Sequence, residues 1–375
     1  MPARAECLTG SAVAIALTVA SSSASAEPGP DSPRPPEDAH GGVPSPDRRA
    51  LAVTTSVVPG LILHGAGHYT LGRRRTAYRL LAAEGLGFGA LLVGGGVLVF
   101  TGANRYLTAP AAATTIAGVG LIGMSFFADV IGTAWPLESR GEATLRRPRV
   151  EAELGYRAIH DPQFAYAHLV KQRVDVALFG WRISPEMWLA LDDTNARLRM
   201  ELAYRPWGPR VDRAADDGSF FEVRAAFTHH RYGGDGFRTL TSEIAGQGRL
   251  DLARIDPWLT GQFAEFELGL AVQTFDYDLA GVQNDNETLL LSRFAHGVYI
   301  GRPDRPPYGE ASYFYDHRHD TYAGGLNGIA IGAPGFFGLD ARVYATHNWG
   351  IRADIAAGAA TLGGLSLLVR LPPRP

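Results

Sequence analysis

The chain has 375 residues, a length that predicts either two regions or one large β-structure. Its 35 basic and 38 acidic side chains nearly cancel, so no field of one sign attracts nucleic acid. We therefore expect no nucleic-acid partner.

The first segment predicts export. Arg4 precedes the apolar stretch GSAVAIALTVA, and the Ala-Ser-Ala that ends at Ala26 supplies the small residues that signal peptidase requires. We expect residues 1–26 to be a cleavable signal peptide, with an uncleaved N-terminal membrane anchor as the alternative. The one cysteine, Cys7, lies in this segment. The mature chain is then expected to contain neither a disulfide nor a thiol nucleophile.

Residues 27–50 follow and are rich in proline and charge. Such a composition cannot bury enough apolar surface to offset the entropy lost on ordering. The sequence predicts a disordered, proline-rich linker over this range.

Residues 51–140 predict a glycine-rich helical hairpin. The stretches 85–104 and 106–128 carry no ionised side chain. About 20 helical residues at 1.5 Å each match a hydrocarbon core of about 30 Å. Glycines allow two helices to approach closely in lipid. A pair of buried helices in a soluble domain is the alternative.

Arginines flank both ends of this hairpin and create a conflict over its topology. The positive-inside rule places both flanks in the cytoplasm, whereas a cleaved signal peptide places them outside it. Either the charge rule fails here, or the hairpin packs against other protein or lies in another membrane. The flanking residues are Arg73, Arg74, Arg75 and Arg79 before the hairpin and Arg140, Arg146, Arg147 and Arg149 after it.

The lead-in to the hairpin, PGLILHGAGHYTLGRRRTAYRLLAAEG at 59–85, contains two histidines. Its Pro-Gly, Gly, Tyr and Gly order resembles that of small bacterial two-helix membrane domains, a resemblance that implies a structural hairpin and not an activity. His64 and His68 are four residues apart, a spacing that can bind metal on a helix. Gly65 and Gly67 surround them and no Glu follows His64, so we expect structural histidines, with a metal site as the weaker alternative.

From residue 149 onward the pattern changes to strands. In RLRMELAYR (197–205) and EFELGLAVQ (265–273), apolar and polar side chains alternate, so each strand has one apolar and one polar face. Turn clusters such as GRPDRPPYG separate these runs. We count about ten to twelve strands over 149–371, close to the pitch of about 10 residues plus a turn in an outer-membrane barrel. The predicted fold is mainly β: an antiparallel membrane β-barrel preceded by an α-helical hairpin.

A soluble β-sandwich also alternates, with its apolar face turned inward. Export, long strands and aromatic residues near the strand ends favour the barrel. On these features residues 149–371 resemble the outer-membrane β-barrels of Gram-negative bacteria, in pattern and without a motif of one family. Such barrels usually end on an aromatic residue, commonly Phe, whereas GLSLLVRLPPRP ends on proline. Residues 363–371 are the candidate closing strand.

Two histidines lie in YFYDHRHDTY, residues 313–322. His317 and His319 point to one face of a strand and could share a metal ion, but a site needs three or four ligands. Outer-membrane phospholipases and lipid A deacylases use a His and a Ser on the lipid-facing rim. An enzyme of that type, centred on these two histidines, is the first alternative. Ser312 faces away from His317 by strand parity, so non-catalytic rim histidines are the main expectation.

The polar strand faces predict a lumen lined by both signs of charge. We expect a structural or narrow-pore transport role in the outer membrane, with no identifiable catalysis, cofactor or metal. A barrel of this size is mostly filled by its own side chains, which disfavours a wide porin. A periplasmic β-domain tethered in the inner membrane, acting as a scaffold, is the second alternative. Membrane lipid is the expected partner, and other envelope proteins are candidates for contact through the hairpin. The candidate lumen residues are Arg197, Arg199, Glu201, Glu265, Glu267, Asp316, Arg318 and Asp320.

Overall fold

The structure is a computed structural model of the full chain. It describes residues 45–102, 106–160, 167–233, 236–277, 284–317, 335–358 and 360–371. The predicted signal peptide, most of the predicted linker, and Arg318, His319 and Asp320 lie outside the described residues.

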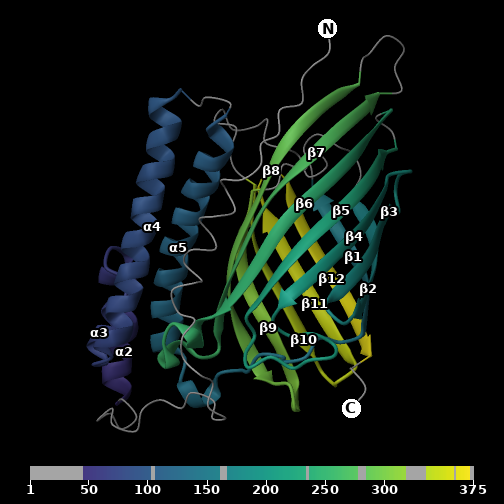
Figure 1. The fold of residues 1–375 in the computed structure, drawn as a ribbon. Helices are drawn as coiled ribbons and strands as arrows, with labels where there is room; N and C mark the ends of the chain where they lie inside the picture. The colour runs from purple at the N-terminus through teal and green to yellow at the C-terminus, as the bar shows by residue number, and fades with distance from the viewer. Residues whose placement is uncertain are drawn as a thin grey trace.

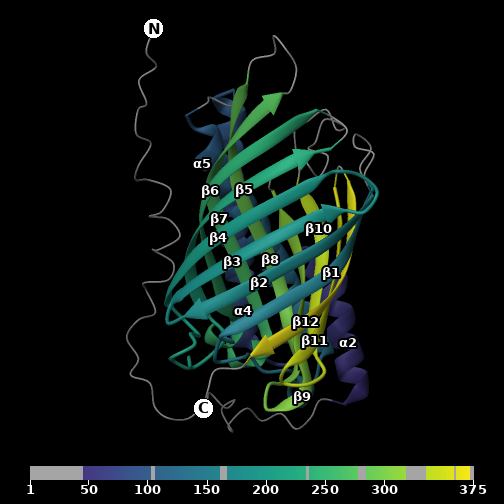
Figure 2. The same cartoon turned by 90° about the vertical axis from the view of Figure 1, so that its right-hand side faces the viewer.

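Twelve antiparallel strands form a closed barrel, in which each strand pairs with its neighbours in sequence and β1 closes on β12 (Figures 1 and 2). The antiparallel barrel predicted from the sequence is therefore confirmed. The strands are β1 (Val150–His160), β2 (His168–Leu178), β3 (Trp181–Ala190), β4 (Ala196–Trp207), β5 (Phe220–Tyr232), β6 (Phe237–Asp251), β7 (Gln262–Tyr277), β8 (Asp285–Arg302), β9 (Arg305–Asp316), β10 (Phe336–Tyr344), β11 (Trp349–Ala357) and β12 (Thr361–Leu371).

The barrel closes although its last strand has no aromatic end. Val150 at the start of β1 lies opposite Leu371 at the end of β12, and their pairing continues to His160 and Thr361. The two chain ends of the barrel therefore lie together at one end of it, which we call the terminal end. The opposite end, at the connection of β1 to β2, is the distal end.

The strands turn their apolar faces outward and their charged faces into the lumen. This is the reverse of a soluble β-sandwich, whose apolar faces are buried against each other. Exposed apolar side chains surround most of the barrel, among them Leu154 on β1, Val176 on β2, Ile183 on β3, Leu202 on β4, Val223 on β5, Ile244 on β6, Val272 on β7, Leu339 on β10, Ile351 on β11 and Leu367 on β12.

The predicted helical hairpin stands beside the barrel as α4 (Arg74–Phe100) and α5 (Thr108–Ala134), with α5 next to β7 and β8 (Figure 1). Both helices are long and apolar enough to cross a membrane. Glycines set their close approach: a Cβ at Gly118 would lie 2.6 Å from the carbonyl oxygen of Gly87. Any side chain larger than hydrogen at this crossing would push the helices apart.

Two short helices precede the hairpin, α2 (Pro46–Val57) and α3 (Ala66–Thr70). Residues 46–50 are thus helical, and the disordered linker predicted over 27–50 was wrong for them. Local capping explains the helix start, because Ser45 accepts a hydrogen bond from the backbone N–H of Arg48 and Pro46 occupies the first turn.

The foot of the hairpin, by which we mean the ends of α4 and α5 next to 135–140, is fixed to the barrel by arginines. Arg140 donates to the carbonyl oxygens of Trp258 at 2.6 Å and Thr260 at 3.0 Å, both in the β6–β7 connection. Arg79 pairs with Asp256 of the same connection at 3.1 Å. Two of the flanking arginines, Arg79 and Arg140, therefore contact the barrel.

Candidate functional site

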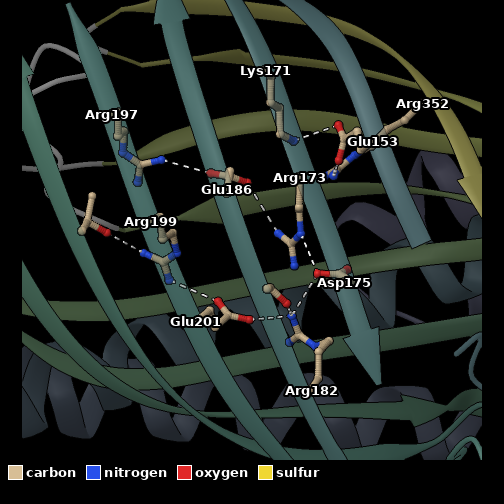
Figure 3. A network of polar contacts seen from close by, with 12 residues as sticks. Glu153, Lys171, Arg173, Asp175, Arg182, Glu186, Arg197, Arg199, Glu201 and Arg352 are labelled. Atoms are coloured by element: carbon tan, nitrogen blue, oxygen red, sulfur yellow. Dashed lines mark hydrogen bonds and ion pairs between the residues drawn. The ribbon is translucent and has the colours of Figure 1, made fainter. Parts of the chain in front are cut away.

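The lumen holds a network of ion pairs, shown in Figure 3. On β4, Arg199 contacts Glu201 at 3.2 Å and Glu243 of β6 at 2.5 Å. Glu201 in turn accepts from Arg182 of β3 at 2.7 Å. Arg199 and Glu201 are on the inward face of β4, because successive side chains of a strand point to opposite faces and Leu202 is exposed on the outside of the barrel. The candidates Arg199 and Glu201 thus lie inside the closed barrel.

Neighbouring strands extend this network around the wall. Arg197, another candidate, contacts Glu186 at 3.2 Å, and Glu186 also lies 3.6 Å from Arg173. On β1 and β2, Glu153 accepts from Lys171 at 2.8 Å and lies 3.4 Å from Arg352 of β11 (Figure 3). Charges of both signs therefore alternate across adjacent strands.

A second part of the network lies across β6 to β10. The candidate Glu265 accepts from Arg249 at 2.5 Å and from Arg293 at 3.0 Å. Arg249 also binds Glu310 at 2.8 Å. The candidate Glu267 pairs with Arg224. The structure therefore places both predicted glutamates of β7 in the lumen, each with an arginine partner.

Glu222 is a buried carboxylate of β5 that the sequence analysis did not single out. It is 1% exposed and accepts from Arg182 at 2.5 Å, Arg147 at 2.9 Å and Arg205 at 3.1 Å. Alternation on β5 could have placed it in the lumen. Its partner Arg147 comes from outside the barrel strands, and no sequence period predicts that contact.

Arg147 belongs to segment 140–149, which crosses the terminal end of the lumen. The backbone N–H of Glu142 donates to the carbonyl oxygen of Gly301 at 2.9 Å, and the backbone N–H of Arg147 donates to the carbonyl oxygen of Arg210 at 3.2 Å. Burial lowers the pKa of Arg147, and Glu222 acts in the opposite direction. The segment is thus fixed on both sides of the opening and covers it.

Apolar side chains fill the lumen towards the distal end. Their shared features are burial and an inward position near the ends of the strands. The cluster comprises Ile159, Leu169, Trp188, Tyr232, Ala356 and Leu362, with Phe314 and Phe336 packed against it. Buried ion pairs and this apolar cluster thus both line the inside of the barrel, and the cluster lies towards the distal end.

Of the remaining lumen candidates, the structure describes Asp316 alone. Asp316 is the last residue of β9, opposite Arg293 of β8. Arg318 and Asp320, as well as His319, lie outside the described residues. The charged cluster predicted in YFYDHRHDTY is therefore described only up to His317.

His317 lies opposite a serine that the sequence analysis missed. Its backbone N–H donates to the carbonyl oxygen of Ser292 on β8 at 2.7 Å, and its Nδ1 shares a hydrogen bond of 2.7 Å with Tyr315. Ser292 was missed because the β8–β9 register, which aligns Arg293 with Asp316, cannot be read from one sequence.

This pair does not form an accessible hydrolase site. The Ser292 Oγ has no hydrogen-bond partner among the described residues, and the side chain is 1% exposed. It shares an outward face with Phe294, which packs against Gly120 of α5. A lipid ester could reach this hydroxyl only if the surrounding chain moved, so the arrangement gives no support to the lipid-hydrolase alternative.

The two histidines of the lead-in bind different partners. His64 Nδ1 shares a hydrogen bond of 2.6 Å with Ser125, and the His64 N–H donates to Glu84 at 3.0 Å. His68 Nδ1 contacts Asp129 at 2.6 Å. In the part of the chain that the structure describes, no three His, Cys, Asp or Glu residues are grouped to hold a metal ion. The metal hypothesis for His64 and His68 therefore has no structural support.

Asp129 instead organises the lead-in. Its carboxylate accepts the backbone N–H groups of Gly65, Gly67 and His68, each at 3.0 Å. Gly65 has φ of +92°, a left-handed conformation that glycine adopts without strain. Burial lowers the pKa of His68, while its contact with Asp129 acts in the opposite direction. These contacts connect the lead-in to α5, as expected of structural histidines.

Comparisons with known proteins give no family. No protein-family profile and no curated protein matches the chain. Among solved structures, it is similar to the translocator domain of the autotransporter NalP from Neisseria meningitidis, at 12% identity and a TM-score of 0.34, covering 60% of this chain and 90% of that one. The outer membrane protein Omp33 of Acinetobacter baumannii is 9% identical with a TM-score of 0.30, covering 61% and 100%.

The KdgM porin is 10% identical with a TM-score of 0.30, covering 58% of this chain and 98% of that one. The barrel fold follows from the strand pairing of this chain itself.

Proposed function

We propose that this chain is an outer-membrane β-barrel with a structural role, whose lumen is closed by its own side chains. The observation that carries the proposal is the inverted barrel: apolar side chains outside and ion pairs inside a closed ring of twelve strands. Among β-structures, only a closed barrel satisfies its backbone hydrogen bonds in lipid. The export expected from the N-terminal segment supports the same location.

The filled lumen favours a structural role over conduction. Arg182 pairs with both Glu201 and Glu222, and each of the three residues is at most 5% exposed. An ion that passes these residues would have to compete with buried charges that already neutralise one another, which opposes conduction. Segment 140–149 and the distal apolar cluster add two further barriers.

Planar-bilayer recording of the purified, folded protein tests this proposal. We expect no stable open-channel current from the wild-type protein. The double variant Arg182→Ala with Glu222→Ala should give intermittent currents, because it removes the centre of the network. A matched control, Leu202→Ala with Val223→Ala, shortens side chains on the outer face and should stay silent.

A steady single-channel conductance of the wild-type protein would overturn the structural role and assign a narrow pore. In that case charge reversal at Glu201 should change ion selectivity, since this carboxylate lies in the lumen wall. The recording therefore separates the two roles that the sequence left open.

A further inference from the structure

We propose that the α4–α5 hairpin crosses the same membrane as the barrel and that membrane lipid covers its outward face. This inference rests on the proposed outer-membrane location and adds a second membrane-embedded element to it. Each helix has 27 residues, which corresponds to about 40 Å at 1.5 Å per residue. That length spans a bilayer of about 40–45 Å including its headgroups.

The inner face of the hairpin is packed on the barrel wall. A Cβ at Gly120 would lie 2.7 Å from the ring of Phe294 on β8, so α5 lies directly against this strand. One to two turns further along α5, the Phe127 ring is 4.2 Å from Tyr313 of β9 and stacks with His296 at 6.3 Å. These contacts place the hairpin alongside the strands, at the same depth as the barrel wall.

The outer face of α4 is apolar and uncovered. Leu92 is 72% exposed, Val93 64% and Val99 76%. Burying such side chains in an apolar medium is favourable, roughly in proportion to the apolar area removed from water. The same kind of side chain covers the outside of the barrel, as at Leu270 and Val272 of neighbouring β7. One continuous apolar surface therefore runs from the strands onto the hairpin.

The foot of the hairpin matches an interfacial position at the terminal end. Val58, Leu61 and Ile62 lie between α2 and α3 in the chain and are strongly exposed. The two helices stand at the lower end of the hairpin in Figure 1. Burial lowers the pKa of Arg140 to about 10, so this guanidinium remains cationic at neutral pH while it binds carbonyl oxygens of the barrel. Arg73 lies 3.8 Å over the ring of Trp258. Both helix ends are thereby held at the level of the barrel's terminal end.

These contacts favour the barrel's own membrane over the inner membrane. A hairpin inserted in the inner membrane would have to leave β8 and β9 and lose the arginine contacts at its foot. Lipid is also favoured over a second copy as the cover of α4, because the exposed surface is continuous with the lipid-facing barrel wall. If a second copy of the chain covered α4 instead, cysteines on this face would form disulfide-linked dimers.

Cysteine labelling tests the inference in full-length protein carrying Cys7→Ser, because the chain has no other cysteine. Thr101→Cys lies at the hairpin tip and Ser139→Cys just past its foot, both exposed. The barrel provides matched controls: Thr194→Cys in the distal β3–β4 connection and Asp304→Cys in the terminal-end β8–β9 turn. A membrane-impermeant maleimide is added to intact cells, and then to cells with a permeabilised outer membrane.

We expect the reagent to label Thr101→Cys and Thr194→Cys on intact cells. Ser139→Cys and Asp304→Cys should require permeabilisation. If the barrel pair behaves in this way but Thr101→Cys also requires permeabilisation, the hairpin does not cross the barrel's membrane and the inference is wrong. If Thr194→Cys and Asp304→Cys are equally protected, the outer-membrane proposal itself fails, and the inference falls with it.

A fifth variant tests the lipid cover. Val93→Cys, in the third of α4 nearest the hairpin tip, should react with a lipophilic maleimide and not with a charged one. Oxidation should leave it monomeric on a non-reducing gel. A disulfide-linked dimer as the main product would assign this face to a second copy of the chain and overturn the lipid assignment.

Discussion

Replacing Glu222 by Gln should strongly destabilise the barrel. The substitution keeps the side-chain volume, so it removes a charge without opening a cavity. Glu222 accepts from Arg182, Arg147 and Arg205 and is 1% exposed. Loss of one partner of a buried ion pair costs about 3–5 kcal/mol, because the remaining charge stays buried. We expect the free energy of unfolding to fall by about that amount.

Urea titration of the detergent-folded protein measures this loss, read as the disappearance of the fast-migrating unboiled form on a gel. A cost of 3 kcal/mol is about a hundredfold in the unfolding equilibrium. Glu287→Gln, at an exposed position on β8, is the control and should change the free energy by no more than about 0.5 kcal/mol. If Glu222→Gln unfolds within about 1 kcal/mol of the wild type, the lumen network does not hold the barrel as argued here.

Three further outcomes follow from the hairpin and its foot. Arg140→Ala should speed proteolysis of the β6–β7 connection, residues 252–261, by at least about tenfold. The reason is that hydrogen bonds to a charged group contribute about 1.5–3 kcal/mol each to stability. An unchanged rate of cleavage would contradict the anchoring role of Arg140. Gly118→Leu should lower the free energy of unfolding by about 1–3 kcal/mol, because the larger side chain forces the two helices apart. Val119→Leu, at the exposed neighbouring position, should leave it unchanged. Equal urea midpoints for the two variants would refute the close packing. Burial lowers the pKa of His68 below 6.5, so unfolding takes up a proton and stability falls as pH drops from about 7 to about 5. His68→Gln should flatten that dependence in urea titrations across this range, and a slope identical to the wild type would assign it to other groups.

Alternation predicts which side of a strand is polar, but not which strand lies opposite. The period of two in 197–205 and 265–273 predicts one polar face per strand, and the charged residues Arg199, Glu201, Glu265 and Glu267 on that face are buried in the structure. It could not predict the partner of His317, because Ser292 meets it only through the β8–β9 register. The sequence therefore predicts the strands of the barrel and their polar faces, but not which residues lie opposite each other on neighbouring strands.

The arginines around the hairpin were harder to interpret for a different reason. Charge rules treat such residues as facing water or membrane headgroups. Arg140 instead binds carbonyl oxygens of Trp258 and Thr260, more than a hundred positions away in the chain. Backbone acceptors have no sequence signature, so only the folded structure reveals the contact. The partners of His64 and His68 could have been suspected, since Glu84 and Asp129 are acids at the edges of apolar stretches.

Membrane fractionation followed by gel electrophoresis with and without boiling tests the central claim most directly. A closed, lipid-embedded barrel predicts recovery in the outer-membrane fraction and a band that migrates faster before boiling than after. Recovery with inner-membrane markers and a single mobility at both temperatures would contradict the account, and the twelve strands would then have to belong to a water-exposed domain.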